Sequence, residues 1–177
     1  MNSLGVLRTV TLHGLFPQIF VLNLSAPFIP QFFGAQLQKI LPYIDYLIGN
    51  EAEAEAWASA NGLPDPKDLP AVAKALAEQP KSNPTRDRIV VITHGAQPTI
   101  AVRSSRLGDV KTYGVNALKD EEITDTNGAG DAFAGGLLGA LAAGKSLDEA
   151  IDVGHTLGAM CVTQVGPQYK WPKVKVL

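Results

Sequence analysis

The stretch "DTNGAGDAF", residues 125–133, places two aspartates on either side of small residues and leads directly into an apolar pattern with helical spacing. Gly128, Ala129 and Gly130 predict successive backbone N–H groups without partners at the positive end of that helix, which would bind a phosphate or a developing negative charge. Asp131 could act there as a general base that takes a proton from an attacking hydroxyl. It could also be a helix-end residue that interacts with the helix dipole, and spacing alone leaves both interpretations open.

A second phosphate-binding pattern, "GALAAGKS" from Gly139 to Ser146, matches the P-loop motif G-x-x-x-x-G-K-S. A P-loop follows a buried strand, whereas the alanine- and leucine-rich residues before Gly139 predict a helix. We therefore favour a helix–turn–helix in which Gly144 ends one helix and Lys145 lies at its negative end. Ser146 then caps the next helix with Glu149 at the capping-box position. A P-loop nucleoside triphosphatase that uses Lys145 is the alternative.

The composition is typical of one soluble globular domain: 177 residues, 46% hydrophobic and 18% charged, with a formal net charge of −2. This charge balance argues against a nucleic-acid partner, which would require a basic face. We expect no membrane span, because no apolar run reaches the roughly 18 residues that one requires. Cys161 is the only cysteine, which excludes an internal disulfide and favours a reducing, intracellular compartment.

Short apolar runs alternate with helical patterns after residue 18, which predicts an α/β fold with a mostly parallel sheet and helices on both faces. The short link "HGAQP" predicts a hairpin, so the sheet should be mixed. Residues 81–88 are interpreted as a polar loop. We expect strands at 19–23, 45–49, 89–93, 99–103 and 110–115, and helices at 30–44, 51–62 and 66–79 and from about 131 and 147.

The stretch "DTNGAGDAFAGG" strongly resembles the signature near the C-terminal end of the ribokinase-like (PfkB) carbohydrate and nucleoside kinases. Within that group, "VLNLSAPFIPQFF", "LPYIDYLIGNEAEAEAWA" and the asparagine of "DTNGAGD" resemble the eukaryotic adenosine kinases. The resemblance runs from about Phe20 to about Pro172. We therefore divide the chain into an unassigned segment, 1–18, and the C-terminal part of a ribokinase-like kinase domain, 19–177.

The resemblance implies a three-layer α/β/α fold with a central, mostly parallel (mixed) sheet. It also implies transfer of a phosphoryl group from ATP to the 5′-hydroxyl of adenosine, with Mg²⁺ and a monovalent cation as cofactors. The enzyme is expected to be monomeric and to lie in the cytoplasm, with the nucleus as a second location. Kinases of this family are considerably longer. Their first strands, most of the ribose pocket and the lid are missing from the resemblance, so we expect weak or no activity from this chain alone.

The resemblance also implies roles for individual residues. Asp131 matches the catalytic base, and Gly128, Ala129 and Gly130 match the anion hole. Asn127 lies where the family contacts the nucleoside. Asn50 and Glu53 match an N-x-x-E motif that organises magnesium and phosphate, with Glu53 acting on the magnesium through water. The residues that match positions near ATP are Thr93, Gly95, His155 and Phe28.

Several of these residues have a structural alternative. Asn50 and Glu53 are also spaced as a capping box. His155 and Phe28 could be packing residues, and Asp125 could support either a monovalent cation or a loop turn. Another PfkB sugar or nucleoside kinase, or a non-catalytic ATP-binding fragment, remains the alternative function.

Overall fold

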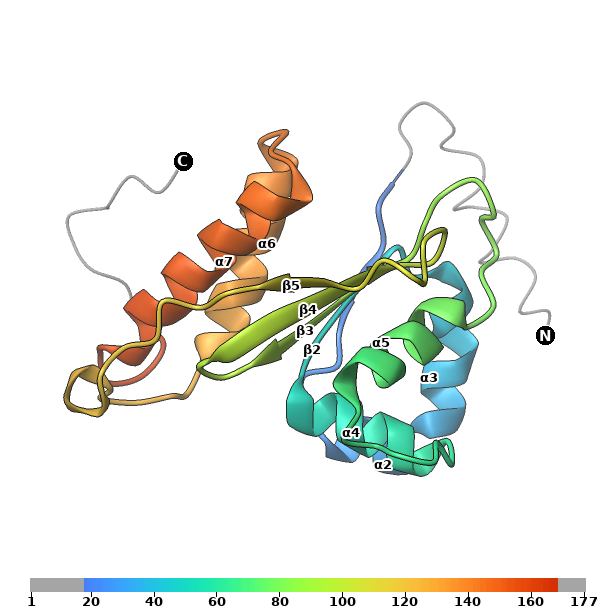
Figure 1. Ribbon diagram of the computed structural model, residues 1–177, viewed down its shortest axis with the longest axis horizontal. Coiled ribbons are helices and arrows are strands. Elements are labelled where there is room, and N and C mark those ends of the chain that lie inside the picture. The colour runs from blue at the N-terminus through green and yellow to red at the C-terminus, as the bar shows by residue number, and fades with distance from the viewer. Residues whose placement is uncertain (1–17, 169–177) are drawn as a thin grey trace, which may run out of the picture.

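The computed structural model describes residues 18–168, which form a mixed sheet between two layers of helices (Figure 1). The order of the strands in the sheet follows their order in the chain. β1, β2 and β3 run parallel to one another, β4 is antiparallel to β3, and β5 is antiparallel to β4. The predicted α/β class, the mixed sheet and the hairpin between the third and fourth strands are confirmed. The strands are β1 (Val21–Asn23), β2 (Tyr46–Asn50), β3 (Ile89–His94), β4 (Gln97–Arg103) and β5 (Lys111–Tyr113).

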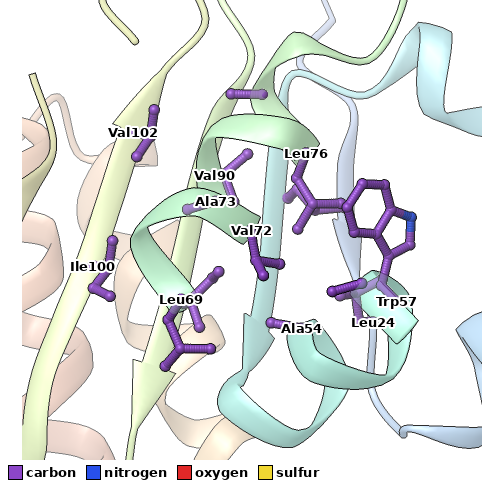
Figure 2. Close-up of a cluster of buried hydrophobic side chains, with 14 of the residues drawn as sticks. Leu24, Ala54, Trp57, Leu69, Val72, Ala73, Leu76, Val90, Ile100 and Val102 are labelled. Carbon is purple, nitrogen blue, oxygen red and sulfur yellow. The ribbon is translucent and has the colours of Figure 1, made fainter. Parts of the chain in front are cut away.

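Side chains that alternate along the strands supply a hydrophobic core on each face of the sheet, as the period of two requires. On one face, Val90 and Ile92 pack with α3 (Gly34–Ile40), α4 (Glu51–Ala60) and α5 (Leu69–Glu78). Figure 2 shows this core, to which α4 contributes Trp57 and α5 contributes Leu76. On the other face, Val91 and Ile89 pack under α6 (Ala129–Ala142) and α7 (Leu147–Val162).

The expected helix at 30–44 is divided into three short elements. These are α2 (Phe28–Phe32), α3 and a 3-10 turn, η1 (Leu41–Tyr43). The break falls at Phe33, whose backbone leaves the helical region with φ −116° and ψ 26°. Pro42 then lies in the 3-10 turn, because a proline without an N–H suits the first residues of a helical turn. Apolar spacing predicts Phe32, Leu37 and Leu41 on one side of a single helix. Leu37 and Leu41 are buried, but Phe32 is 76% exposed, because the break at Phe33 interrupts the helical spacing.

Helix ends follow local capping. Asp68 accepts a hydrogen bond from the N–H of Ala71, so α5 begins at Leu69 rather than at 66. Gly62, with φ +71°, follows the end of α4 and serves as the predicted terminating glycine. A second 3-10 turn, η2 (Asp120–Glu122), precedes the loop that leads to α6.

Arg88 was assigned to a polar loop, and the structure corrects this assignment. Its side chain is 0% exposed and donates hydrogen bonds to backbone carbonyls at the end of α5 and in η1. Burial lowers the pKa of Arg88, and the charge of Asp45 opposes that effect. The guanidinium fork therefore stabilises a point where a helix end, a turn and β3 meet.

Asp45 is a second buried charge near the first residue of β2. It accepts hydrogen bonds from Lys81 Nζ at 2.6 Å, from Arg86 at 2.9 Å and from the backbone N–H of Phe20 at 3.0 Å. Burial alone would raise the pKa of Asp45. The bonds to Lys81, the Phe20 N–H and Arg86 outweigh burial, so its pKa is lowered.

Candidate functional site

The N-terminal end of α6 is formed by the glycine-rich loop. The helix begins at Ala129, two residues before the expected start, which makes Asp131 the third residue of its first turn. Gly128 precedes the helix with φ +81°, and a Cβ there would lie 2.8 Å from Cβ of Pro167. Only glycine meets both demands, the left-handed backbone and the close approach.

Two of the three expected anion-binding amides are open. The N–H groups of Gly128 and Gly130 make no hydrogen bond within residues 18–168. The N–H of Ala129 bonds to the carbonyl of Thr126 at 3.3 Å, which corrects the expectation of three successive free amides. Asp131 is exposed beside them. A helix end with free N–H groups and a carboxylate can bind an anion and accept a proton.

Asp125 fixes the shape of this loop. One carboxylate oxygen accepts the N–H of Asn127 at 2.9 Å, and the other accepts the N–H of Gly166 at 2.9 Å. These two bonds lower the pKa of Asp125. Of the two roles considered for Asp125, the structure therefore supports the loop turn. Within the described residues, no three His, Cys, Asp or Glu side chains cluster in a way that could hold a metal ion.

The predicted N-x-x-E pair forms a complete capping box at the start of α4. The Asn50 side chain accepts the N–H of Glu53 at 2.9 Å, and Glu53 accepts the N–H and side-chain amide of Asn50 at 2.9 and 3.1 Å. Glu53 is 4% exposed. Burial raises the pKa of Glu53, with smaller contributions from the charges of Glu51 and Asp131. The charge of Asp131 helps to raise the pKa of Glu53, so the start of α6 lies within electrostatic range of the start of α4, although the two segments are about eighty residues apart in sequence.

The sheet explains this proximity. Asn50 is the last residue of β2 and lies opposite Thr93 near the end of β3, so α4 begins at the carboxyl edge of the parallel strands. Thr93 donates to the Gly49 carbonyl at 3.4 Å, and Gly95 occupies the hairpin turn with φ +52°. The carboxyl edge of an α/β sheet is the usual position for a ligand.

His155 lies on α7 beside a cavity of about 500 Å³. Its Nε2 lies 2.8 Å from Oγ1 of Thr99, and its ring lies 5.5 Å from that of Phe133. Burial lowers the pKa of His155, and Asp152 opposes the effect, so the neutral imidazole is favoured. The cavity is lined by residues 114–116 after β5 and by one side of α7: Asp152, His155, Thr156, Ala159, Met160 and Thr163.

Close packing of α6 on α7 places this cavity beside the loop. A Cβ on Gly154 would lie 2.8 Å from the ring of Phe133, so the two helices can approach this closely only because Gly154 lacks one. A Cβ on Gly158 would lie 3.5 Å from the carbonyl of Ala129. A smaller cavity of about 310 Å³, lined by Arg103 and Lys111 among others, contains none of the predicted site residues.

Phe28 does not line the cavity of α7; it lies 52% exposed on α2, which packs against α4, and its place near ATP stays a prediction. The P-loop interpretation of Lys145 is wrong, because residues 139–142 are part of α6 and no strand precedes them. Gly144 ends that helix with φ +80°, and Ser146 and Glu149 form the predicted capping box.

The sequence analysis assigned no site role to Cys161, which lies beside the loop, or to Ser25. Cys161 is buried with its Sγ 3.6 Å from the Asn127 carbonyl; burial, then the charges of Asp125 and Asp131, raise the pKa of its thiol. Ser25, just beyond β1, has φ +63°, which is strained for a residue other than glycine. The only sequence signal for Ser25 was its place in "NLSAP", and nothing local predicted the neighbours of Cys161.

The comparison with known protein families identifies the class of protein. The pattern of the pfkB family carbohydrate kinases matches residues 6–174, so this chain belongs to that family. The match begins within the segment 1–18, for which the sequence motifs had suggested no assignment. Within the described residues, no helix is both long enough and apolar enough to cross a membrane.

Two similar proteins within that family are adenosine kinases of fungi. The chain is 60% identical over 158 residues to adenosine kinase of Schizophyllum commune, covering 89% of this chain and 46% of that one. It is 46% identical to adenosine kinase of Schizosaccharomyces pombe, covering 87% and 44% of the two chains.

Solved structures agree with these relatives. The fold matches that of Anopheles gambiae adenosine kinase, crystallised with P1,P4-di(adenosine-5) tetraphosphate, with a TM-score of 0.83 and 38% identity. That match covers 93% of this chain and 47% of the other. The chain therefore spans slightly under half the length of the relatives that it matches.

Proposed function

We propose that this chain forms the phosphate-binding and proton-accepting half of an adenosine kinase, which transfers a phosphoryl group from ATP to the 5′-hydroxyl of adenosine. The observation that carries the proposal is the convergence of Asp131, the open amides of Gly128 and Gly130, and the Asn50–Glu53 pair at one edge of the sheet. The similarity to adenosine kinases of fungi supports the same conclusion.

In the proposed reaction, Asp131 accepts the proton of the 5′-hydroxyl as that oxygen attacks the γ-phosphorus of ATP. The bond between the γ-phosphorus and the β–γ bridging oxygen breaks, and ADP leaves. The N–H groups of Gly128 and Gly130, at the positive end of α6, stabilise the charge on the transferred group. Asn127, the residue before Gly128, is exposed and available to the nucleoside.

The nucleotide would enter with Mg²⁺ bound to its phosphates, because Mg²⁺ is usually held by substrate phosphates and one or two carboxylates. Both oxygens of Glu53 already accept hydrogen bonds from Asn50, which suits an indirect role through water rather than direct coordination. Thr93 and Gly95, at the end of β3 and in the turn after it, would border the phosphates.

The cavity beside His155 is large enough for an adenine ring and lies next to the start of α6. The neutral imidazole can donate or accept a hydrogen bond there, and Ala159 and Met160 supply apolar surface for the base. We further propose purine salvage in the cytoplasm, with the nucleus as a second location, as the setting of this activity.

The test of the proposed base uses a chain in which the portion of the Schizophyllum commune enzyme outside the match is joined to residues 1–177. Asp131→Asn should lower turnover about 10²-fold or more, because a general base contributes that much. The affinity for MgATP, measured by calorimetry, should remain within a few-fold.

Asp109→Asn is the matched control, because Asp109 is also exposed but lies in the loop between β4 and β5. It should leave both quantities unchanged. A turnover for Asp131→Asn within a few-fold of the unsubstituted chain would make Asp131 a helix-end residue and refute its catalytic role. Transfer to a sugar but not to adenosine would instead favour another PfkB kinase.

A further inference from the structure

Thr99, on β4, is a buried polar residue that the proposed reaction does not use. Its side chain is 1% exposed and lies on the same face of the sheet as that of Ala101, two residues further on, which packs under α6 and α7. Its hydroxyl oxygen lies 2.8 Å from Nε2 of His155 on α7. Within residues 18–168 this hydroxyl makes no other hydrogen bond, so the imidazole ring is its single partner there.

The hydroxyl proton of Thr99 decides which nitrogen of His155 carries a proton. A neutral imidazole has one N–H donor and one nitrogen that accepts, and the bond made by one nitrogen sets the state of the other. If Nε2–H donated to Thr99, the threonine proton would have no acceptor among the described residues. A buried O–H without a partner is costly. The favoured arrangement therefore has Thr99 donating to Nε2, which places the proton of His155 on Nδ1.

The ring that carries this Nδ1–H is held in place beside a cavity. Thr99 bonds to its Nε2, and the ring of Phe133 packs against it with 5.5 Å between the ring centroids. His155 lines the cavity of about 500 Å³ between α7 and residues 114–116, and its Nδ1 makes no hydrogen bond within residues 18–168. Burial lowers the pKa of His155, so the ring is neutral. Nδ1–H is thus a donor that a ligand in this cavity can use.

We propose that Thr99 is a positioning residue for the nucleotide: its hydroxyl fixes His155 as the Nδ1–H tautomer, and Nδ1–H donates a hydrogen bond to a ring nitrogen of the purine base. This inference rests on the proposed function, which assigns the adenine of ATP to the cavity beside His155. The ring nitrogens N1, N3 and N7 of adenine are acceptors. The opposite tautomer would direct a lone pair at such a nitrogen and repel it. Thr99 acts on the base only through His155.

The first experiment measures the tautomer directly, by ¹⁵N NMR of residues 1–177 labelled in histidine, at about pH 8, where imidazole is neutral. Protonated and unprotonated ring nitrogens resonate at well-separated frequencies, and His155→Gln assigns the signals among the three histidines. Nδ1 should be protonated. Thr99→Val, which removes the hydroxyl but keeps the shape, should populate both tautomers, and Thr99→Ser should restore Nδ1–H. An Nε2–H form in the unsubstituted chain, or a tautomer unchanged by Thr99→Val, would overturn the proposal.

The second experiment measures MgATP binding by calorimetry in the chain that joins the Schizophyllum commune portion to residues 1–177. Thr99→Val should weaken binding about three- to tenfold, the effect of one hydrogen bond, and Thr99→Ser should restore it. Thr112→Val is the matched control, because Thr112 is exposed on β5 and makes no side-chain hydrogen bond within the described residues. It should change the affinity by less than about twofold.

Deaza analogues of ATP separate a hydrogen bond to the base from simple packing. The 1-deaza, 3-deaza and 7-deaza analogues each replace one ring nitrogen by C–H. For one of them Thr99→Val should have no effect, because the acceptor is already missing. An equal loss for ATP and for all three analogues would overturn the positioning role of Thr99.

The remaining outcomes separate this inference from the proposed function. ATP binding that Thr99→Val leaves unchanged would overturn the hydrogen bond to the base, even with the Nδ1–H tautomer present. No MgATP binding by the joined chain would overturn both proposals. A joined chain that shows the expected tautomer and analogue pattern but phosphorylates neither adenosine nor a sugar would refute the proposed function and leave the role of Thr99 supported.

Discussion

Replacing Arg88 by methionine should destabilise the chain by about 3 kcal/mol. The substitution keeps most of the aliphatic stem but removes every hydrogen bond that the buried guanidinium donates. Within the described residues, the carbonyl of Leu76 also accepts from Gln79 N–H, and that of Leu41 from Ile44 N–H. Among residues 18–168, no other group donates to the carbonyls of Gln79 and Pro80.

The magnitude follows from the charged hydrogen bonds that are lost. Each hydrogen bond from a charged donor contributes about 1.5–3 kcal/mol. Gln79 is half-buried and Pro80 is exposed, so water replaces part of these bonds and a net loss of about 3 kcal/mol is expected. Because a domain of this size has only about 5–15 kcal/mol of stability, the loss is large. With a urea m-value of about 2 kcal/mol/M, the unfolding midpoint should fall by about 1.5 M.

The assay is urea unfolding of residues 1–177, followed by circular dichroism. Arg106→Met is the control, because Arg106 is exposed and makes no side-chain hydrogen bond or ion pair within the described residues; its effect should stay within about 0.5 kcal/mol. Arg88→Lys should be intermediate, since one ammonium cannot reach the carbonyls at both sites. Equal midpoints for Arg88→Met and Arg106→Met would refute this reasoning.

Three further outcomes are expected. The pKa of Asp45 is lowered in the folded chain, so its contribution to stability is complete above about pH 4, its unfolded pKa, and is lost as the pH falls through the folded value. The difference in urea midpoint between the unsubstituted chain and Asp45→Asn should thus be constant from pH 7 to 5 and shrink towards pH 3; a constant difference would contradict this. Gly128→Ala should lower the free energy of unfolding by about 1–2 kcal/mol and weaken MgATP binding in calorimetry. Gly108 has no positive φ and has open space around it, so Gly108→Ala should change neither the stability nor the binding. Lys145→Ala should leave the affinity for MgATP unchanged, and loss of binding would restore the P-loop interpretation.

The sequence by itself determined the features that depend on residues within about four positions of one another. The capping boxes of Asn50 with Glu53 and of Ser146 with Glu149 are present as predicted, as is the terminating glycine at Gly144. The hairpin after β3 is also confirmed. These interactions form within one helical turn or one tight loop, so the identities of neighbouring residues are sufficient to predict them.

The tertiary structure alone decided which distant groups meet. Arg88 sits at the end of a polar segment, yet it is buried because the end of α5 and the turn at Leu41 come together around it. Asp131 influences Glu53 because α6 and α4 both begin at the carboxyl edge of the sheet. Local spacing cannot encode such contacts, because they depend on strand order and helix packing, and these are set by burial of the whole core on both faces of the sheet.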